Sequence, residues 1–305
     1  MMRKFLIKSF VFLSLILGAF VLLLSRADER TDEFYARFIS PNQSSLIIGT
    51  SRAAQAINPK VLNDELNRSD IFNYAFTNEH SPYGPVYLKS ILAKMDDGSR
   101  NGIFILSVDP WSLSADKENP EDLSSFRENG LMLDGMIDVS SNPNFFYLMK
   151  YYDGPFKRLL LKENDPSLIL HKNGWLEVDV PMDSSSISKR TIKRISSYRD
   201  DVMKRSTISN ARLAFLEKTI NTLSAKGKIF LIRLPVCSEM SELENDFCPE
   251  FDSLMMAISI RNKAPFYAMM EDSVEYIFTD GNHLARESSS VVSSKIAEFI
   301  KVHAK

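Results

Sequence analysis

Residues 44–52 read SSLIIGTSR, an apolar run that ends at a glycine and continues into small and polar residues. The run predicts a short buried strand, and the residues after it predict a tight turn and the start of a helix. Ser51 would lie on that turn, where backbone N–H groups stabilise negative charge near its oxygen. A nucleophile of acyl transfer uses such a position. Alternatively, Ser51 only caps the helix, because serine is a preferred N-cap residue.

A second motif lies near the other end of the chain, where residues 278–284 read FTDGNHL. The chain contains only four histidines, and one of them is His283. Asp280 precedes it by three residues, so both side chains can share one short turn. An aspartate placed there can bond one ring nitrogen and leave the other free as a base. Ser51, His283 and Asp280 are therefore the candidate catalytic residues.

These two motifs resemble the first and last blocks of the SGNH superfamily, the GDSL-like esterases and acyltransferases. In that family the nucleophile follows a strand as Gly-Asp-Ser, and the last block reads Asp-x-x-His. Residues 49–51 and 280–283 match these blocks in order. The resemblance implies an α/β fold, a three-layer flavodoxin-like arrangement around a parallel sheet. It would cover residues 31–305 with an inserted α+β segment at about 112–200.

The resemblance also points to the oxyanion hole. The second block resembles residues 72–78, FNYAFTN, and implies that backbone N–H groups of Asn78 and Ser51 are the donors. In the third block, residues 103–111 read IFILSVDPW, and Asp109 stands where the family has an asparagine. A charged carboxylate would repel an oxyanion. We therefore expect the Asp109 side chain to turn aside and bond the local backbone.

Strands and helices alternate around these motifs. Extended runs at 71–76 and 103–108 flank a helical pattern at 86–94, which predicts a right-handed parallel βαβ unit. Ligands bind at the carboxyl ends of such strands. The alternation returns with a helix at 210–223, a strand at 229–235, a helix at 253–262, a strand at 274–278 and a closing helix at 290–302.

Between about 112 and 200 this rhythm fails, and we interpret the segment as an insertion lying over the strand ends. Residues 144–152 are strongly aromatic and belong either to a satellite core or to a ligand platform. Asn173-Gly174 predicts a hairpin turn. Within it, Trp175 is a candidate acceptor-site residue. His171 lacks a carboxylate at a spacing that would orient it.

Arg233 interrupts the apolar run at 229–235. A buried arginine needs a partner. Arg233 is therefore either part of a structural ion pair or an anion-binding group near the site.

The composition limits the classes of function. The chain has 305 residues, 44% of them hydrophobic, which suits one large α/β domain with an insertion. With 37 basic against 39 acidic residues, the net charge of −2 gives no general attraction for nucleic acid. We expect no nucleic-acid partner, no cofactor and no metal.

The N-terminus predicts a membrane segment. Every residue in 9–25 is apolar or small, and Arg3, Lys4 and Lys8 precede the run. We interpret residues 1–30 as an uncleaved anchor and juxtamembrane segment, with the N-terminus in the cytoplasm and the domain outside it. The alternative is a cleaved signal peptide, although the sequence before Ala27 is a poor cleavage site.

Cys237 and Cys248 are separated by ten residues in a polar segment. In an oxidising compartment they would close a short disulfide loop, which is the preferred interpretation given the anchor. Two unpaired thiols are the alternative.

Together these features predict a membrane-anchored extracytoplasmic serine esterase or O-acyltransferase. The resemblance implies an acylated glycan or cell-wall polymer as substrate and a multispanning membrane O-acyltransferase as a possible partner. Hydrolysis and transfer share the chemistry up to the acyl-enzyme, so the motifs do not separate them. Two alternatives are a catalytically degenerate glycan-binding or assembly partner, which Asp109 would favour, and a lipid-surface esterase.

Overall fold

The computed structural model describes residues 1–161, 167–271 and 275–304. Its centre is a five-stranded parallel sheet in the order β2-β1-β3-β8-β9. The strands are β1 (Ser45–Ile48), β2 (Ile71–Asn73), β3 (Gly102–Ser107), β8 (Gly227–Arg233) and β9 (Phe266–Ala268). Numbered within the sheet, this order is 2-1-3-4-5, the flavodoxin-like doubly wound order. The predicted α/β fold with a parallel sheet is confirmed.

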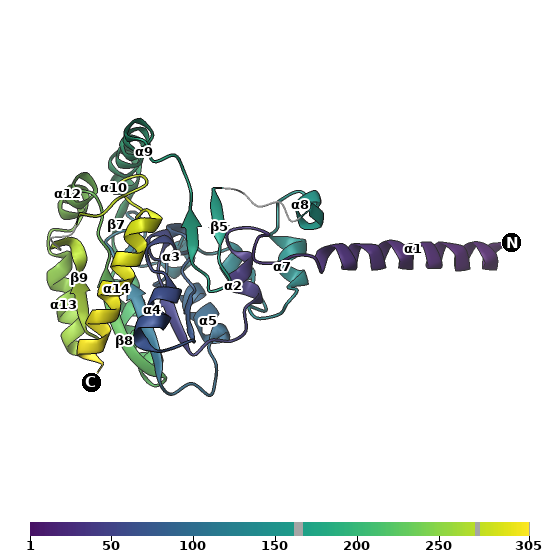
Figure 1. Cartoon of the computed structure of the whole chain (residues 1–305), viewed down its shortest axis with the longest axis horizontal. Helices are drawn as coiled ribbons and strands as arrows, with labels where there is room; N and C mark the ends of the chain where they lie inside the picture. The colour runs from purple at the N-terminus through teal and green to yellow at the C-terminus, as the bar shows by residue number, and fades with distance from the viewer. Residues whose placement is uncertain (162–166, 272–274, 305) are drawn as a thin grey trace.

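Helices cover both faces of the sheet and make three layers (Figure 1). One face packs on α3 (Ser51–Ala56), α4 (Pro59–Leu66) and α14 (Arg286–His303). The other packs on α5 (Pro85–Lys94), α11 (Asn210–Ser224) and α13 (Phe251–Asn262). Neighbouring side chains of a strand point to opposite faces, and every residue of β1 and β3 is buried. Both strands are therefore mostly apolar, with a serine at one end of each.

The strand expected at 274–278 is wrong for its described part. Residues 275–277 have no regular structure, Phe278 forms only an isolated bridge to Leu284, and residue 274 lies outside the described residues. The fifth strand is β9, which pairs with the end of β8. Its three residues are only partly buried, so it has too few positions to show a clear strand pattern.

The insertion is built from short elements. Its predicted hairpin is present as β5 (Leu168–Leu170) and β6 (Leu176–Val178), with Gly174 in the left-handed region at φ 82°. In the aromatic stretch, Tyr147 and Leu148 are buried in the main core and not in a satellite core, which favours a packing role over a ligand platform. The remaining elements of the segment are β4 (Ser114–Asp116), η2 (Leu123–Ser125), α6 (Met132–Gly135), α7 (Phe145–Lys150), α8 (Phe156–Leu161), α9 (Ser184–Ser197), η3 (Tyr198–Val202), α10 (Met203–Arg205) and β7 (Ser206–Ile208).

The N-terminal helix α1 (Met2–Leu24) extends away from the domain (Figure 1). Its mean hydropathy is 2.5, and it is long and apolar enough to cross a membrane. An N-terminal signal sequence would have the same properties. Only its last residues contact the domain, where Leu24 is buried and Phe20 packs edge-on against Phe156 at 5.7 Å between ring centroids. A short helix, α2 (Tyr35–Ile39), follows.

The disulfide expectation is wrong, because Cys237 and Cys248 are both free. The segment between them is not a loop but the ten-residue helix α12 (Ser238–Phe247), and the cysteines cap its two ends. A helix of that length separates its ends by about 15 Å. A disulfide requires Cα atoms within about 7 Å.

Candidate active site

The turn after β1 places Ser51 at the carboxyl end of the sheet. A Cβ added at Gly49 would lie 2.6 Å from the Ala53 Cβ and 2.9 Å from the Ser107 Cβ. Only glycine lets α3 begin so close to β1 and β3. Thr50 is the N-cap, and its side chain accepts a hydrogen bond from the Arg52 backbone. Ser51 is therefore the first residue of α3 and not its cap, so the capping alternative is wrong.

The structure brings the three candidate catalytic side chains together. Ser51 Oγ lies 2.8 Å from His283 Nε2. On the other side of the imidazole ring, Nδ1 lies 3.1 and 3.0 Å from the two carboxylate oxygens of Asp280. The loop that carries them is folded by its own backbone, because the N–H groups of Asn282 and His283 donate to Asp280 Oδ1 at 3.1 and 2.9 Å.

Asp280 has a second cationic partner that the sequence did not reveal. Arg194 of α9 donates to Asp280 Oδ2 from Nε at 3.0 Å and from its terminal nitrogen at 2.8 Å. Burial favours the neutral acid, but the bond and charge of His283 and the charge of Arg194 outweigh it and lower the pKa of Asp280. A charged Asp280 holds a proton on Nδ1 and leaves Nε2 to accept one from Ser51.

A buried ionic network lies beside the triad and decides the role of Arg233. Arg52 contacts the Asn282 side-chain oxygen at 2.9 and 2.5 Å and Glu244 at 2.6 Å. Glu244 also pairs with Arg233 at 2.8 Å, and Arg233 pairs with Asp252 at 2.8 Å. The substrate-binding role suggested for Arg233 is therefore wrong, because it forms a structural ion pair. The network ties α3 to the loop that carries the base.

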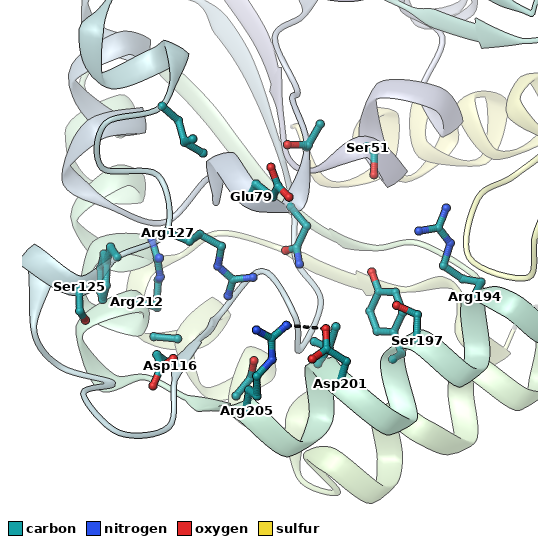
Figure 2. Close-up of a pocket in the computed structure, with 18 of the residues that line it drawn as sticks. Ser51, Glu79, Asp116, Ser125, Arg127, Arg194, Ser197, Asp201, Arg205 and Arg212 are labelled. Carbon is teal, nitrogen blue, oxygen red and sulfur yellow. Dashed lines mark hydrogen bonds and ion pairs between the residues drawn. The ribbon is translucent and has the colours of Figure 1, made fainter.

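Ser51 and His283 line a cavity of about 880 Å³. Figure 2 shows Ser51 across this cavity from Arg205 and Asp201. Asn78, the first residue of η1 (Asn78–His80), lines it too, and its side-chain oxygen is buried without a hydrogen-bond partner among the described residues. The insertion supplies a wall of the cavity. The lining from that segment is Ala115, Asp116, Ser125, Phe126, Arg127, Leu131, Arg194, Ser197, Tyr198, Asp201, Val202, Arg205 and Ser206.

Asp109 does not face this cavity. Its carboxylate oxygen Oδ1 accepts a hydrogen bond from the Ser112 backbone at 2.9 Å, and its own N–H donates to the Ser112 hydroxyl at 3.1 Å. The side chain is buried and is not among the residues that line the cavity. Burial raises the pKa of Asp109 against the opposing charge of Arg52. The side chain thus turns aside as expected, and the position that the resemblance assigns to the oxyanion asparagine does not bind substrate here.

Trp175 is also placed away from the cavity lining. Its Nε1 donates to the Gln55 carbonyl at 2.8 Å, and its ring stacks on His171 at 4.8 Å between centroids. The expectation that His171 lacks a carboxylate is wrong, because Glu177 lies 2.8 Å from its Nε2. The strands of the hairpin bring these two residues together, although they are six positions apart.

No protein-family model matches the chain, and no curated protein matches it. Among solved structures, the chain is similar to Est24, a carbohydrate acetylesterase from Sinorhizobium meliloti, with 12% sequence identity and a TM-score of 0.42. The match covers 86% of this chain and 99% of that chain.

Two charged partners of the site, Arg194 and Glu244, were not predicted from the sequence. Neither position carries a local signal, because Arg194 comes from the irregular insertion and Glu244 from α12. Asn282 could have been singled out from the sequence as a site residue, since it lies inside the Asp280–His283 motif. Its contact with Arg52, however, depends on how α3 and the loop pack.

Proposed function

We propose that this chain is a membrane-anchored, extracytoplasmic SGNH-type serine esterase or O-acyltransferase that acts on glycan esters of the cell envelope. The observation that carries the proposal is the continuous chain of contacts from Ser51 Oγ through His283 to Asp280. It lies at the carboxyl ends of parallel strands and opens into a cavity large enough for a sugar ester.

In the proposed reaction, Ser51 Oγ bonds to the acyl carbonyl carbon as its proton passes to His283 Nε2. The tetrahedral intermediate collapses when the ester C–O bond breaks and the leaving oxygen takes that proton. An acceptor hydroxyl or a water molecule then attacks the acyl-enzyme carbonyl and gives its proton to Nε2. The bond between the acyl carbon and Ser51 Oγ breaks, and Ser51 takes that proton from Nε2. Throughout, Asp280 stabilises the protonated imidazole.

The oxyanion needs donors near Ser51. The backbone N–H of Ser51 at the start of α3 is one donor. The second is the backbone N–H of Asn78, which lines the same cavity. The Asp109 carboxylate accepts a hydrogen bond from the Ser112 backbone and does not line the cavity. In this arrangement it therefore does not face the oxyanion and does not repel it.

The glycan substrate, the extracytoplasmic side and a multispanning membrane O-acyltransferase as partner rest on the sequence resemblance and on α1. An acyl donor delivered at the membrane would make the reaction a transfer, whereas water as the acceptor would make it hydrolysis. The acyl-enzyme is common to both, so its detection is the first test.

The test is covalent labelling of the full-length protein by a fluorophosphonate, which reacts with a serine activated by a base. We expect labelling of the wild type and none of Ser51→Ala. His283→Ala should reduce the labelling rate by about 10³-fold or more, because the base is removed. Ser107→Ala is the matched control, a buried serine outside the triad. Normal labelling of His283→Ala with an intact fold would disprove the assignment.

A specific observation favours a second candidate, a degenerate glycan-binding or assembly partner. Asp109 occupies the apparent position of the family's oxyanion asparagine, so a donor is missing there. A wild-type protein that is not labelled by the fluorophosphonate, yet retains glycan binding, would support this candidate over the enzyme.

A further inference from the structure

The cavity beside Ser51 contains one arginine that differs from its neighbours. Arg127 is partly buried between η2 and α6, and Figure 2 shows its side chain directed toward the space between Ser51 and Arg205. One terminal nitrogen donates to the Ser114 carbonyl at 2.6 Å and to the Ser114 hydroxyl at 3.2 Å. These neutral contacts fix one edge of the guanidinium group and leave its other donors for a ligand.

The other three arginines of the cavity are each paired with a carboxylate. Arg194 pairs with Asp280 at 2.8 Å, Arg205 with Asp201 at 2.5 Å, and Arg212 with Glu128 at 2.6 Å. Within residues 1–161, 167–271 and 275–304, no carboxylate lies within ion-pair distance of Arg127. Its positive charge is therefore not neutralised by a direct partner.

The surroundings of Arg127 make this unpaired charge unfavourable. Burial lowers the pKa of Arg127, and the nearby charge of Arg212 lowers it further; the more distant charges of Glu128 and Asp109 oppose this shift only in part. A partly buried cation without a counter-ion costs free energy, which a bound anion would offset. Arginine is also the side chain best suited to a carboxylate or phosphate, because its planar fork donates two parallel hydrogen bonds.

We propose that Arg127 binds an anionic substituent of the substrate, a carboxylate or a phosphate, while the ester lies at Ser51. The inference rests on the proposed function and narrows its substrate to an acidic glycan or polyol phosphate. Arg127 is then a specificity-determining residue, and it takes no part in the bond-making steps.

Two exposed carboxylates on the cavity, Glu79 and Asp116, limit where an anion can bind. They have no arginine or lysine partner among the described side chains, and they repel negative charge near them. The cavity is thus not a generally positive surface. The cavity would bind one anionic group at Arg127, and the neutral parts of the substrate would lie near Glu79 and Asp116.

The experiment measures binding by calorimetry to the full-length Ser51→Ala protein in detergent, so that no ester is consumed. The probes are a uronic acid trisaccharide, its neutral methyl ester and a glycerol phosphate oligomer. An anion held by two charge-assisted hydrogen bonds should bind roughly tenfold or more tightly than its neutral counterpart. Whichever anionic probe binds identifies the source of the negative charge.

Arg127→Gln should remove the preference for the anionic probe and leave the methyl ester unaffected. Arg199→Gln is the matched control, because Arg199 is exposed on η3 and outside the cavity lining. A purely structural role for Arg127 would weaken all probes alike. If Arg127→Gln does not fold, the Ser51→Ala protein with Arg127 intact still decides the question. Equal affinity for the trisaccharide and its methyl ester overturns the proposal, as does failure of both anionic probes to bind.

Fluorophosphonate labelling of Ser51 separates this inference from the proposed function. Labelling without an anion preference overturns only the role of Arg127. An anion preference that depends on Arg127 but without labelling overturns the enzyme and retains an anion-binding cavity.

Discussion

Asp109→Asn tests the position at which, under the proposed function, the oxyanion asparagine of the resembled family is replaced by an aspartate. The substitution keeps the Oδ1 atom, which accepts the 2.9 Å hydrogen bond from the Ser112 backbone. It replaces Oδ2, which is buried and has no hydrogen-bond partner among the described residues. The local turn should therefore survive, with a change in unfolding free energy below about 1 kcal/mol at low pH.

The stability of this variant should depend on pH with a defined sign. An unfolded aspartate ionises near a pKa of about 3.9, and burial raises the pKa of Asp109 in the folded state. Well below about pH 4 the carboxyl group is neutral in both states. As the pH rises, the unfolded chain loses this proton first, so the wild type loses stability until the raised pKa is passed. Asp109→Asn has no such loss, and its relative stability should increase.

The effect on activity distinguishes two placements of the carboxylate. A charge about 4 Å from the oxyanion at an effective dielectric of 20 would cost roughly 4 kcal/mol, or a rate change of almost 10³-fold. With the carboxylate bonded to Ser112 instead, we expect Asp109→Asn to change the rate by less than about tenfold.

The measurements are urea unfolding between pH 4 and 8 and hydrolysis of 4-nitrophenyl acetate at fixed pH. Asp116→Asn is the control, an exposed aspartate on the cavity that should show no relative gain in stability with pH. A hundredfold gain in the rate of Asp109→Asn would refute our reasoning. A stability of Asp109→Asn relative to the wild type that falls as the pH increases would refute it too.

Three further predictions concern the rest of the chain. Arg194→Gln removes a cation from Asp280 and should make the lowered pKa of Asp280 less low. On acidification, the stability that the ionised Asp280 contributes should therefore be lost at a higher pH than in the wild type. The hydrolysis rate should fall less than about tenfold, because the Arg194 side chain is 41% exposed. Acid titration of unfolding checks the first effect, and no shift would exclude the contact with Asp280. Cys237 and Cys248 should both be alkylated in denaturant without a reductant. In the native protein alkylation should be slow, because burial raises the pKa of Cys237 to about 11. If both cysteines were protected until a reductant is added, they would form a disulfide. The mass of membrane-extracted protein should include α1, and a mature chain that begins near Ala27 would establish a cleaved signal instead.

The sequence alone determined the local framework of the site. Continuous apolar runs that end at small or polar residues identify β1 and β3, because most side chains of a strand buried on both faces are apolar. The Asp280–His283 spacing is short enough for one turn to set its geometry. The position of Ser51 could be predicted from the strand before it, the glycine and the start of the helix. These features depend on neighbours in sequence, so local propensity and periodicity reveal them.

Only the tertiary structure decided which distant charges meet. Arg233 interrupts a buried strand, and the sequence could not tell an anion site from the ion pair that Glu244 provides. Arg194 and Arg127 come from an insertion without periodicity, and their roles depend on the side on which that segment packs. Cys237 and Cys248 are close in sequence but separated by a helix. Burial makes unpaired charges costly, yet the identity of each partner is set by packing and not by spacing.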